Sequence, residues 1–328
     1  MANKQQTGKV TIANIVSMVG VALLMVFTFI GYSFKSGGEL GMDLLITVGI
    51  GGFTALMLWF LVRAKGAENN LDKWKVAEII TLVVYIAFTV YTSVWGGMMH
   101  FFVVNENKES IKSIANEDIQ KIDQLFASYE EFETNAVART KQGLSNATAR
   151  NQKMTDSLKS FMTENAITAA NYEYYVEQQQ DYVVGSMFAN TKSDYEDFKQ
   201  NIMGVVNSWS VVRVPREAKN IEEYAKAYQQ YFTEWSESAT LPVIEFDQTL
   251  RKYTITEAKQ VKTYTIDGGI ESLKFRTAIT EAEGFSILAI IVMIVINILI
   301  LFNYIMAFRT RTIHVGKDTE VDGGRILM

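Results

Sequence analysis

The uncharged stretch FSILAIIVMIVINILILFNYIMAF, residues 285–308, decides the fold of this protein. As a helix its 24 residues span roughly 36 Å at about 1.5 Å per residue, which exceeds the roughly 30 Å hydrocarbon core of a bilayer. Glu281 and Glu283 precede the stretch, and Arg309 and Arg311 follow it. Because basic residues gather on the cytoplasmic side of a span, this pattern predicts a transmembrane helix whose C-terminal end faces the cytoplasm.

Three further apolar stretches lie in the first third of the chain. Residues 12–34 and 44–62 carry no charge, and residues 76–104 contain one carboxylate, Glu78, and one histidine, His100. The third stretch is longer than a bilayer requires, so its outer end is expected to protrude. A cleaved signal peptide is the alternative for the first stretch, but its apolar core would be shorter, about 7–15 residues. We therefore predict four transmembrane helices.

The charge distribution fixes the predicted sidedness. Lysine and arginine are concentrated in residues 1–11, 63–75 and 309–328, which places these segments in the cytoplasm. Residues 105–283 carry 28 acidic and 20 basic residues, a net charge of −8, whereas the remainder contributes +3 to the overall −5. An acidic domain of this kind argues against a nucleic-acid partner. The expected location is the plasma membrane, as in a bacterial inner membrane, with both termini cytoplasmic.

These boundaries give the predicted fold class, an all-α integral membrane protein with a mainly helical exterior domain inserted between the third and fourth transmembrane helices. The predicted parts are an N-terminal membrane part (1–104, with helices at about 12–34, 44–62 and 76–104), an exterior domain (105–283), a fourth transmembrane helix (284–308) and a cytoplasmic tail (309–328).

A regular apolar pattern opens the exterior domain. Apolar residues recur at steps of three and four from Ile111, and the pattern predicts one helix or two stacked helices reaching about Glu164, with a coiled-coil-like face. We predict an interaction surface on this face and on the tyrosines that follow, although such spacing is also typical of a domain's own core. The candidate residues are Leu144, Ala147, Met154, Leu158, Phe161, Tyr172 and Tyr175.

The rest of the exterior domain is predicted to return along this helix. Capping boxes at Ser193 and Asn220, each followed three residues later by glutamate, predict two helix starts, and residues 190–192 are the expected break before the first of them. Residues 243–280 are β-branched and partly alternating, with a turn at Asp267. A small β-hairpin and a continuous helix both remain open for this segment.

No residue pattern indicates catalysis. Cysteine is absent, and His100 and His314 have no second ligand at metal-binding spacing. Glu78 is expected to reach the membrane surface or to pair with Lys75, and asparagines in the last span are expected to bond neighbouring helices. We therefore expect no catalytic, cofactor-binding or metal-binding residue, and no enzyme.

Two functions remain from this reasoning. The first is a structural or assembly subunit of a cell-envelope complex, whose exterior domain contacts other membrane or envelope proteins or further copies of itself. The second is a membrane-bound ligand or stress sensor that signals through a separate cytoplasmic partner. Lipid is an expected partner in both cases. The predicted cytoplasmic segments are short, which favours the first function.

Overall fold

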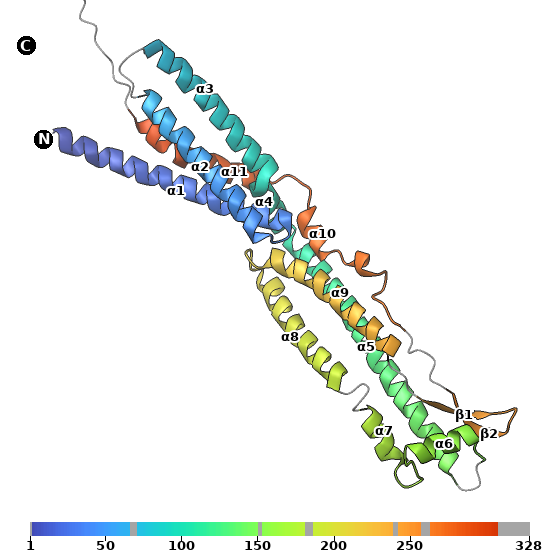
Figure 1. Ribbon diagram of the computed structural model, residues 1–328. Coiled ribbons are helices and arrows are strands. Elements are labelled where there is room, and N and C mark those ends of the chain that lie inside the picture. Colours follow the sequence, from blue (N-terminus) through green and yellow to red (C-terminus); the bar gives the residue numbers. More distant parts are fainter. Residues whose placement is uncertain are drawn as a thin grey trace, which may run out of the picture. The chain divides into compact units, whose positions relative to one another are not determined.

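The computed structural model is mainly helical and divides into two compact units, residues 1–105 with 283–328 and residues 106–282 (Figure 1). The structure describes residues 2–65, 71–149, 153–180, 186–238, 242–256 and 263–307.

The first unit is built from long apolar helices. Its elements are α1 (Ala2–Ser36), α2 (Leu40–Lys65), α3 (Leu71–Val90), a π-helical segment (Tyr91–Gly96), α4 (Gly97–Glu106) and α11 (Ile287–Met306). The helix α1 packs against α2 and α11, and α2 packs against α3. The turn from α1 to α2 uses Gly37 and Gly38, whose φ angles of 71° and 89° suit residues without a Cβ atom.

Three helices in the described part of the chain are long and apolar enough to cross a membrane, Ile12–Ser36, Leu40–Lys65 and Ile287–Met306. Residues 76–104 are helical throughout, with the π-helical segment between α3 and α4. Glycines at this point permit close packing: Gly97 of α4 lies directly against Gly31 of α1. A side chain on either glycine would overlap the other helix.

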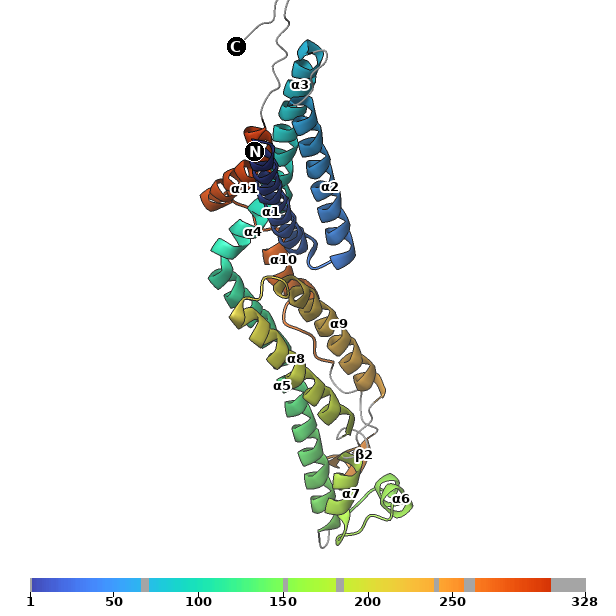
Figure 2. The ribbon, with the colours of Figure 1, turned by 90° about the vertical axis from the view of Figure 1, so that its left-hand side faces the viewer.

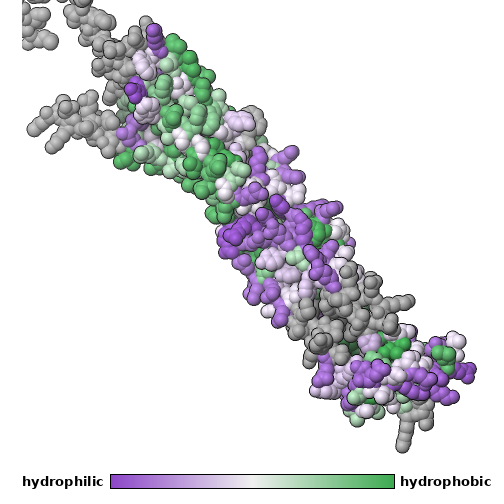
Figure 3. Space-filling view, viewed as in Figure 1, coloured by the Kyte–Doolittle hydropathy of each residue, from purple (hydrophilic) through white to green (hydrophobic). Residues whose placement is uncertain are grey.

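The polarity of the first unit is the reverse of that of a water-soluble bundle. Its interior holds several hydroxyl and carboxyl side chains, and its surface is apolar (Figure 3). The buried polar residues are Ser17, Thr28, Ser33, Asp43, Thr47, Thr54, Glu78, Thr89, Thr92 and Ser286. The exposed large apolar residues include Ile15, Met18, Leu45, Leu56, Ile79, Val83, Ile291 and Ile298. This arrangement suits a solvent of hydrocarbon rather than water.

The second unit is organised along α5 (Lys108–Thr148), a single helix of 41 residues. The helices α8 (Ser186–Ser208) and α9 (Val214–Ser238) pack beside it (Figures 1 and 2). Aromatic rings fill the space between the three helices: Phe126 stacks on Tyr195 at 4.3 Å and meets Phe232 edge to face at 5.0 Å. Burial of such rings makes a large contribution to a core.

Both predicted capping boxes are wrong, because Ser193 and Asn220 lie inside helices. The helix α8 runs without a break from Ser186 through residues 190–192, which contain no glycine or proline to end it. The helix α9 begins at Val214, with Pro215 in its first turn, where the missing N–H of proline is not needed.

The far end of α5 carries a small subdomain, which we call the tip. It consists of α6 (Asp156–Glu164), α7 (Tyr172–Gln180) and the antiparallel strands β1 (Val243–Asp247) and β2 (Lys252–Thr256). Val243 pairs with Thr256 and Asp247 with Lys252. The predicted hairpin therefore exists.

The hairpin turn lies at residues 248–251, where the Asp247 carboxylate accepts the N–H groups of Thr249 and Leu250, at 2.7 Å and 3.0 Å. The prediction of a strand turn at Asp267 is wrong, because that turn leads into a short 3₁₀ helix (Ile270–Ser272) and then α10 (Phe275–Thr280).

Neighbouring elements cover both edges of this hairpin. The Thr140 hydroxyl of α5 donates to the carbonyl of Pro242 at 2.9 Å, and Gly143 of α5 lies against the backbone of Ile244. On the other side, Tyr253 exchanges two backbone hydrogen bonds of 2.9 Å with residues 153–155. Covered edges do not pair with strands of other molecules.

The predicted continuation of one helical face from Leu144 to Phe161 is also wrong. The helix α5 ends at Thr148, and Met154 lies in an extended segment that forms a bridge with Tyr253. The predicted tail, with His314, lies outside the described residues.

Candidate interaction surface

The structure brings all seven predicted surface residues together where the far end of α5 meets the tip. Leu144, Ala147 and Leu158 are buried with no exposed surface, and they form a cluster with Met162 and Ile244. The partly buried members Met154, Phe161, Tyr172 and Tyr175 pack against this cluster. Packing within the chain therefore accounts for the burial of Leu144, Ala147 and Leu158.

The tip also exposes apolar side chains that were not among the residues predicted from the sequence. Leu250 is 55% exposed, Phe246 45% and Val243 38%, all on the hairpin, and Tyr174 of α7 is 62% exposed. Phe246 lies two residues after the buried Ile244, so both are on one face of β1. Its ring meets Tyr253 at 5.2 Å. The alternation in VIEF is the signal that would have placed Phe246 beside Ile244.

Exposed ion pairs also lie at this end of the second unit. Lys141 of α5 lies 3.4 Å from Glu173 of α7, and Lys159 lies 3.1 Å from Asp156 within α6. All four groups are substantially exposed, and such pairs contribute little to stability. This end of the second unit thus exposes charges of both signs together with a few apolar side chains, a composition that protein–protein contacts also have.

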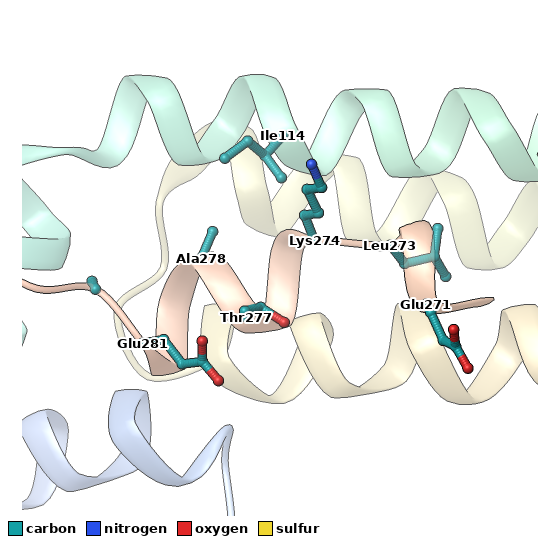
Figure 4. A pocket seen from close by; sticks show the side chains of 8 residues that line it. Ile114, Glu271, Leu273, Lys274, Thr277, Ala278 and Glu281 are labelled. Atoms are coloured by element: carbon teal, nitrogen blue, oxygen red, sulfur yellow. The ribbon is translucent and has the colours of Figure 1, made fainter. Parts of the chain in front are cut away.

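The second unit contains a cavity of about 490 Å³ between α5 and α10. Ile114, Leu273 and Ala278 give it an apolar lining, and Lys274 extends toward α5 while Glu271 and Glu281 lie at its two ends (Figure 4). A cavity with both charges and an apolar wall suits a small amphipathic molecule.

Asp118 fixes α10 against α5 beside this cavity. Its carboxylate is 1% exposed and accepts the backbone N–H groups of Lys274 at 2.8 Å and Phe275 at 2.7 Å. Burial raises the pKa of Asp118 above its ordinary value, and the two N–H donors and Lys121 oppose the shift. Asp118 thus holds the segment that leads to α11.

We expect Asp118→Asn to change how stability depends on pH. The pKa of Asp118 is raised in the folded state, so protonation of this carboxyl group favours folding. This contribution to stability is fully present below the unfolded-state pKa, about 4, and is lost as pH rises through the folded-state pKa. Asparagine keeps an acceptor oxygen and removes the charge. The melting temperature of the variant, relative to that of the native chain in detergent, should therefore increase as pH rises through this window. Parallel pH profiles would contradict this.

A second buried polar group, also outside the membrane-spanning segments, links α5 to α8. The Tyr195 hydroxyl donates to the Asp123 carboxylate, which also lies 2.9 Å from the Lys199 ammonium. Burial and the nearby Asp123 charge raise the pKa of Tyr195. Tyr195 therefore remains protonated and acts as a donor, not as a base.

Polar contacts also join the helices of the first unit. Tyr304 of α11 donates to the carboxylate of Glu78 at 2.6 Å, and Tyr85 of α3 donates to Asn297 at 2.7 Å. Glu78 is 5% exposed, so the prediction that its side chain reaches the membrane surface is wrong. Asn303 of α11 contacts a different helix. Its backbone N–H donates to the Ser17 hydroxyl of α1 at 2.9 Å. These bonds connect α11 to two different helices.

Within the part of the chain that the structure describes, no group of three or more histidine, aspartate or glutamate side chains could hold a metal ion. Comparison with protein-family models, with curated proteins and with solved structures finds no significant match for this chain.

Proposed function

We propose that this chain is a non-enzymatic multi-pass membrane protein with four transmembrane helices, both termini in the cytoplasm and the second unit outside, in a plasma membrane of the bacterial inner-membrane type. The reversed polarity of the first unit supports the membrane location. The basic segments at residues 1–11, 63–75 and 309–328 support the sidedness.

The surface of α3 supports a fourth span beside the three long apolar helices. Its inward-facing Glu78, Tyr85 and Thr89 are buried, whereas its outward-facing residues are large and apolar. The exposed set is Val76, Ile79, Ile80, Val83, Val84 and Ile86, each at least 41% exposed. A helix in water would present the opposite pattern.

For the exterior unit we propose the role of a structural or assembly subunit of an envelope complex. The observation that carries this proposal is the tip: α5 presents, about 60 Å from its own start, a subdomain with its own core and exposed Phe246 and Leu250. Exposed aromatic and aliphatic side chains on a rigid support are typical anchors of protein–protein contacts.

A photo-crosslinking amino acid placed at Phe246 or Leu250 in living cells tests this role. We expect ultraviolet light to give a discrete higher-mass adduct at both positions and none at Tyr224, a 44% exposed residue of α9. The adduct mass distinguishes a second copy of the chain from another envelope protein. The proposal would be contradicted if neither tip position gave an adduct, or if Tyr224 gave an adduct in equal yield.

A ligand sensor is the second candidate, and the cavity between α5 and α10 favours it. A small molecule held there would contact α10, a few residues before α11 begins. A panel of amino acids and dicarboxylates, tested for a rise in melting temperature, examines this function. A sensor should show a rise that Lys274→Ala abolishes and Lys159→Ala, at an exposed position in the tip, retains.

A further inference from the structure

The loop between α8 and α9 combines apolar and basic residues in the sequence WSVVR, residues 209–213. Val212 is 54% exposed, while Trp209 is 9% exposed and Val214 is fully buried. Within a unit whose sequence is acidic, the strongly exposed charged residues of the segment 207–216 are both basic, Arg213 and Arg216. We propose that this loop contacts the lipid headgroups and places Val212 in the outer face of the bilayer.

The backbone holds the loop in a defined shape. Trp209 has a φ angle of 51°, and the N–H groups of Trp209 and Ser210 donate to the carbonyls of Val206 and Val205 at the end of α8. This is a Schellman-type helix end, in which the left-handed position usually holds glycine. The Arg213 guanidinium bonds Asn201 at 2.9 Å and Glu217 at 3.3 Å, which fixes the other side of the loop.

Contacts inside the second unit place this loop at the end where α5 begins. The helix α8 runs antiparallel to α5, because Lys199 pairs with Asp123 and Lys192 with Glu130. The helix α9 runs parallel to α5, because Phe126 meets Tyr228 and Tyr129 stacks on Phe232. Extending both alignments puts residues 209–214 beside residues 111–113, near the start of α5, and Figures 1 and 2 show the α8–α9 connection at this end.

The length of the connecting segment limits the distance between the end of the second unit, Ala282, and the start of α11, Ile287. The unit ends at Ala282 and α11 begins at Ile287, so four residues join them. The five Cα–Cα steps from Ala282 to Ile287 reach at most about 18 Å when fully extended. The α10 segment is fixed to α5 by Asp118, so this short connection joins α11 to the end of the second unit that carries the loop.

The chemistry of the loop matches a lipid surface with anionic headgroups. Arg216 is exposed, and basic side chains near a membrane surface gain electrostatic attraction to anionic lipid. The exposed Val212, next to Arg213, gains free energy when it leaves water. The only acidic residue between 207 and 217, Glu217, is 5% exposed and already bonded to Arg213, so it offers little repulsion.

The test uses the full chain in vesicles of phosphatidylcholine and phosphatidylglycerol. The native sequence has no cysteine, so Val212→Cys, Leu250→Cys and Ile291→Cys can each carry one environment-sensitive fluorophore. Leu250 is the matched control, because it is an equally exposed apolar residue at the opposite end of the second unit. Ile291 of α11 is the membrane control, since this inference rests on the proposed membrane location.

We expect the label at position 212 to emit at shorter wavelength and to be quenched several-fold more by spin-labelled lipid than the label at position 250. Equal quenching at positions 212 and 250, with strong quenching at position 291, would overturn this inference and leave the membrane proposal standing. Absence of quenching at position 291 would overturn the membrane proposal and this inference with it.

Discussion

Replacing Leu158 with glutamate should unfold the tip. Leu158 has no exposed surface and packs with Leu144, Ala147 and Ile244. Loss of a buried leucine side chain alone costs about 2–5 kcal/mol, and a buried carboxylate without a partner adds to this. The total is a large share of the roughly 5–15 kcal/mol that stabilises a typical domain. Circular dichroism melts and limited proteolysis of the full chain in detergent measure the effect.

The matched control is Leu250→Glu, which places the same charge at a 55% exposed leucine in the same subdomain. It should leave the melt and the proteolytic pattern close to those of the native chain. Identical melts for the two variants would show that Leu158 lies on a solvated face, and the packing described for the tip would then be wrong.

A valine at Gly97 should prevent the first unit from folding correctly. A Cβ atom there would lie 2.7 Å from the backbone nitrogen of Tyr32 and 2.8 Å from the carbonyl oxygen of Thr28, so α1 and α4 would have to separate. Overpacking against backbone, which cannot change rotamer, costs at least as much as the roughly 1–3 kcal/mol seen for side-chain crowding. Gel filtration in mild detergent should show aggregation or a strongly lowered melting temperature.

Gly49 provides the control for this substitution. It lies in α2, and an added Cβ atom there would meet nothing within 4 Å. Gly49→Val should therefore behave like the native chain. If both variants remain monodisperse with unchanged melts, the close crossing at Gly31 and Gly97 is not a feature of the folded protein.

The long apolar helices could be predicted because composition alone decides them. A stretch such as residues 285–308 has no alternative to a buried or membrane helix. The helix starts at Ser193 and Asn220 could not be predicted, since a capping box is only a local preference. At Asn220 the side chain instead bonds Glu217 within α9 at 2.9 Å. The Tyr195 ring of α8 and the Tyr228 ring of α9 pack against each other in one aromatic core, downstream of these two positions.

The candidate interaction surface could also be predicted only in part. Helical spacing predicted one shared face for Leu144, Ala147 and Leu158, but only Leu144 and Ala147 lie on the same helix, and Leu158 of α6 joins them through tertiary packing. The spacing could not say whether another part of the chain covers that face. The strand containing Ile244 lies about 100 residues later in sequence and covers it, which leaves Phe246 exposed.

The most direct test of the membrane arrangement is the sidedness of two single cysteines in the otherwise cysteine-free chain. Asn146→Cys lies at an exposed position of α5, and Lys73→Cys lies at an exposed position near the start of α3. A membrane-impermeant thiol reagent added to intact cells should label position 146 at once and position 73 only after the membrane is permeabilised. Labelling of position 73 but not of position 146 in intact cells would contradict the proposed topology.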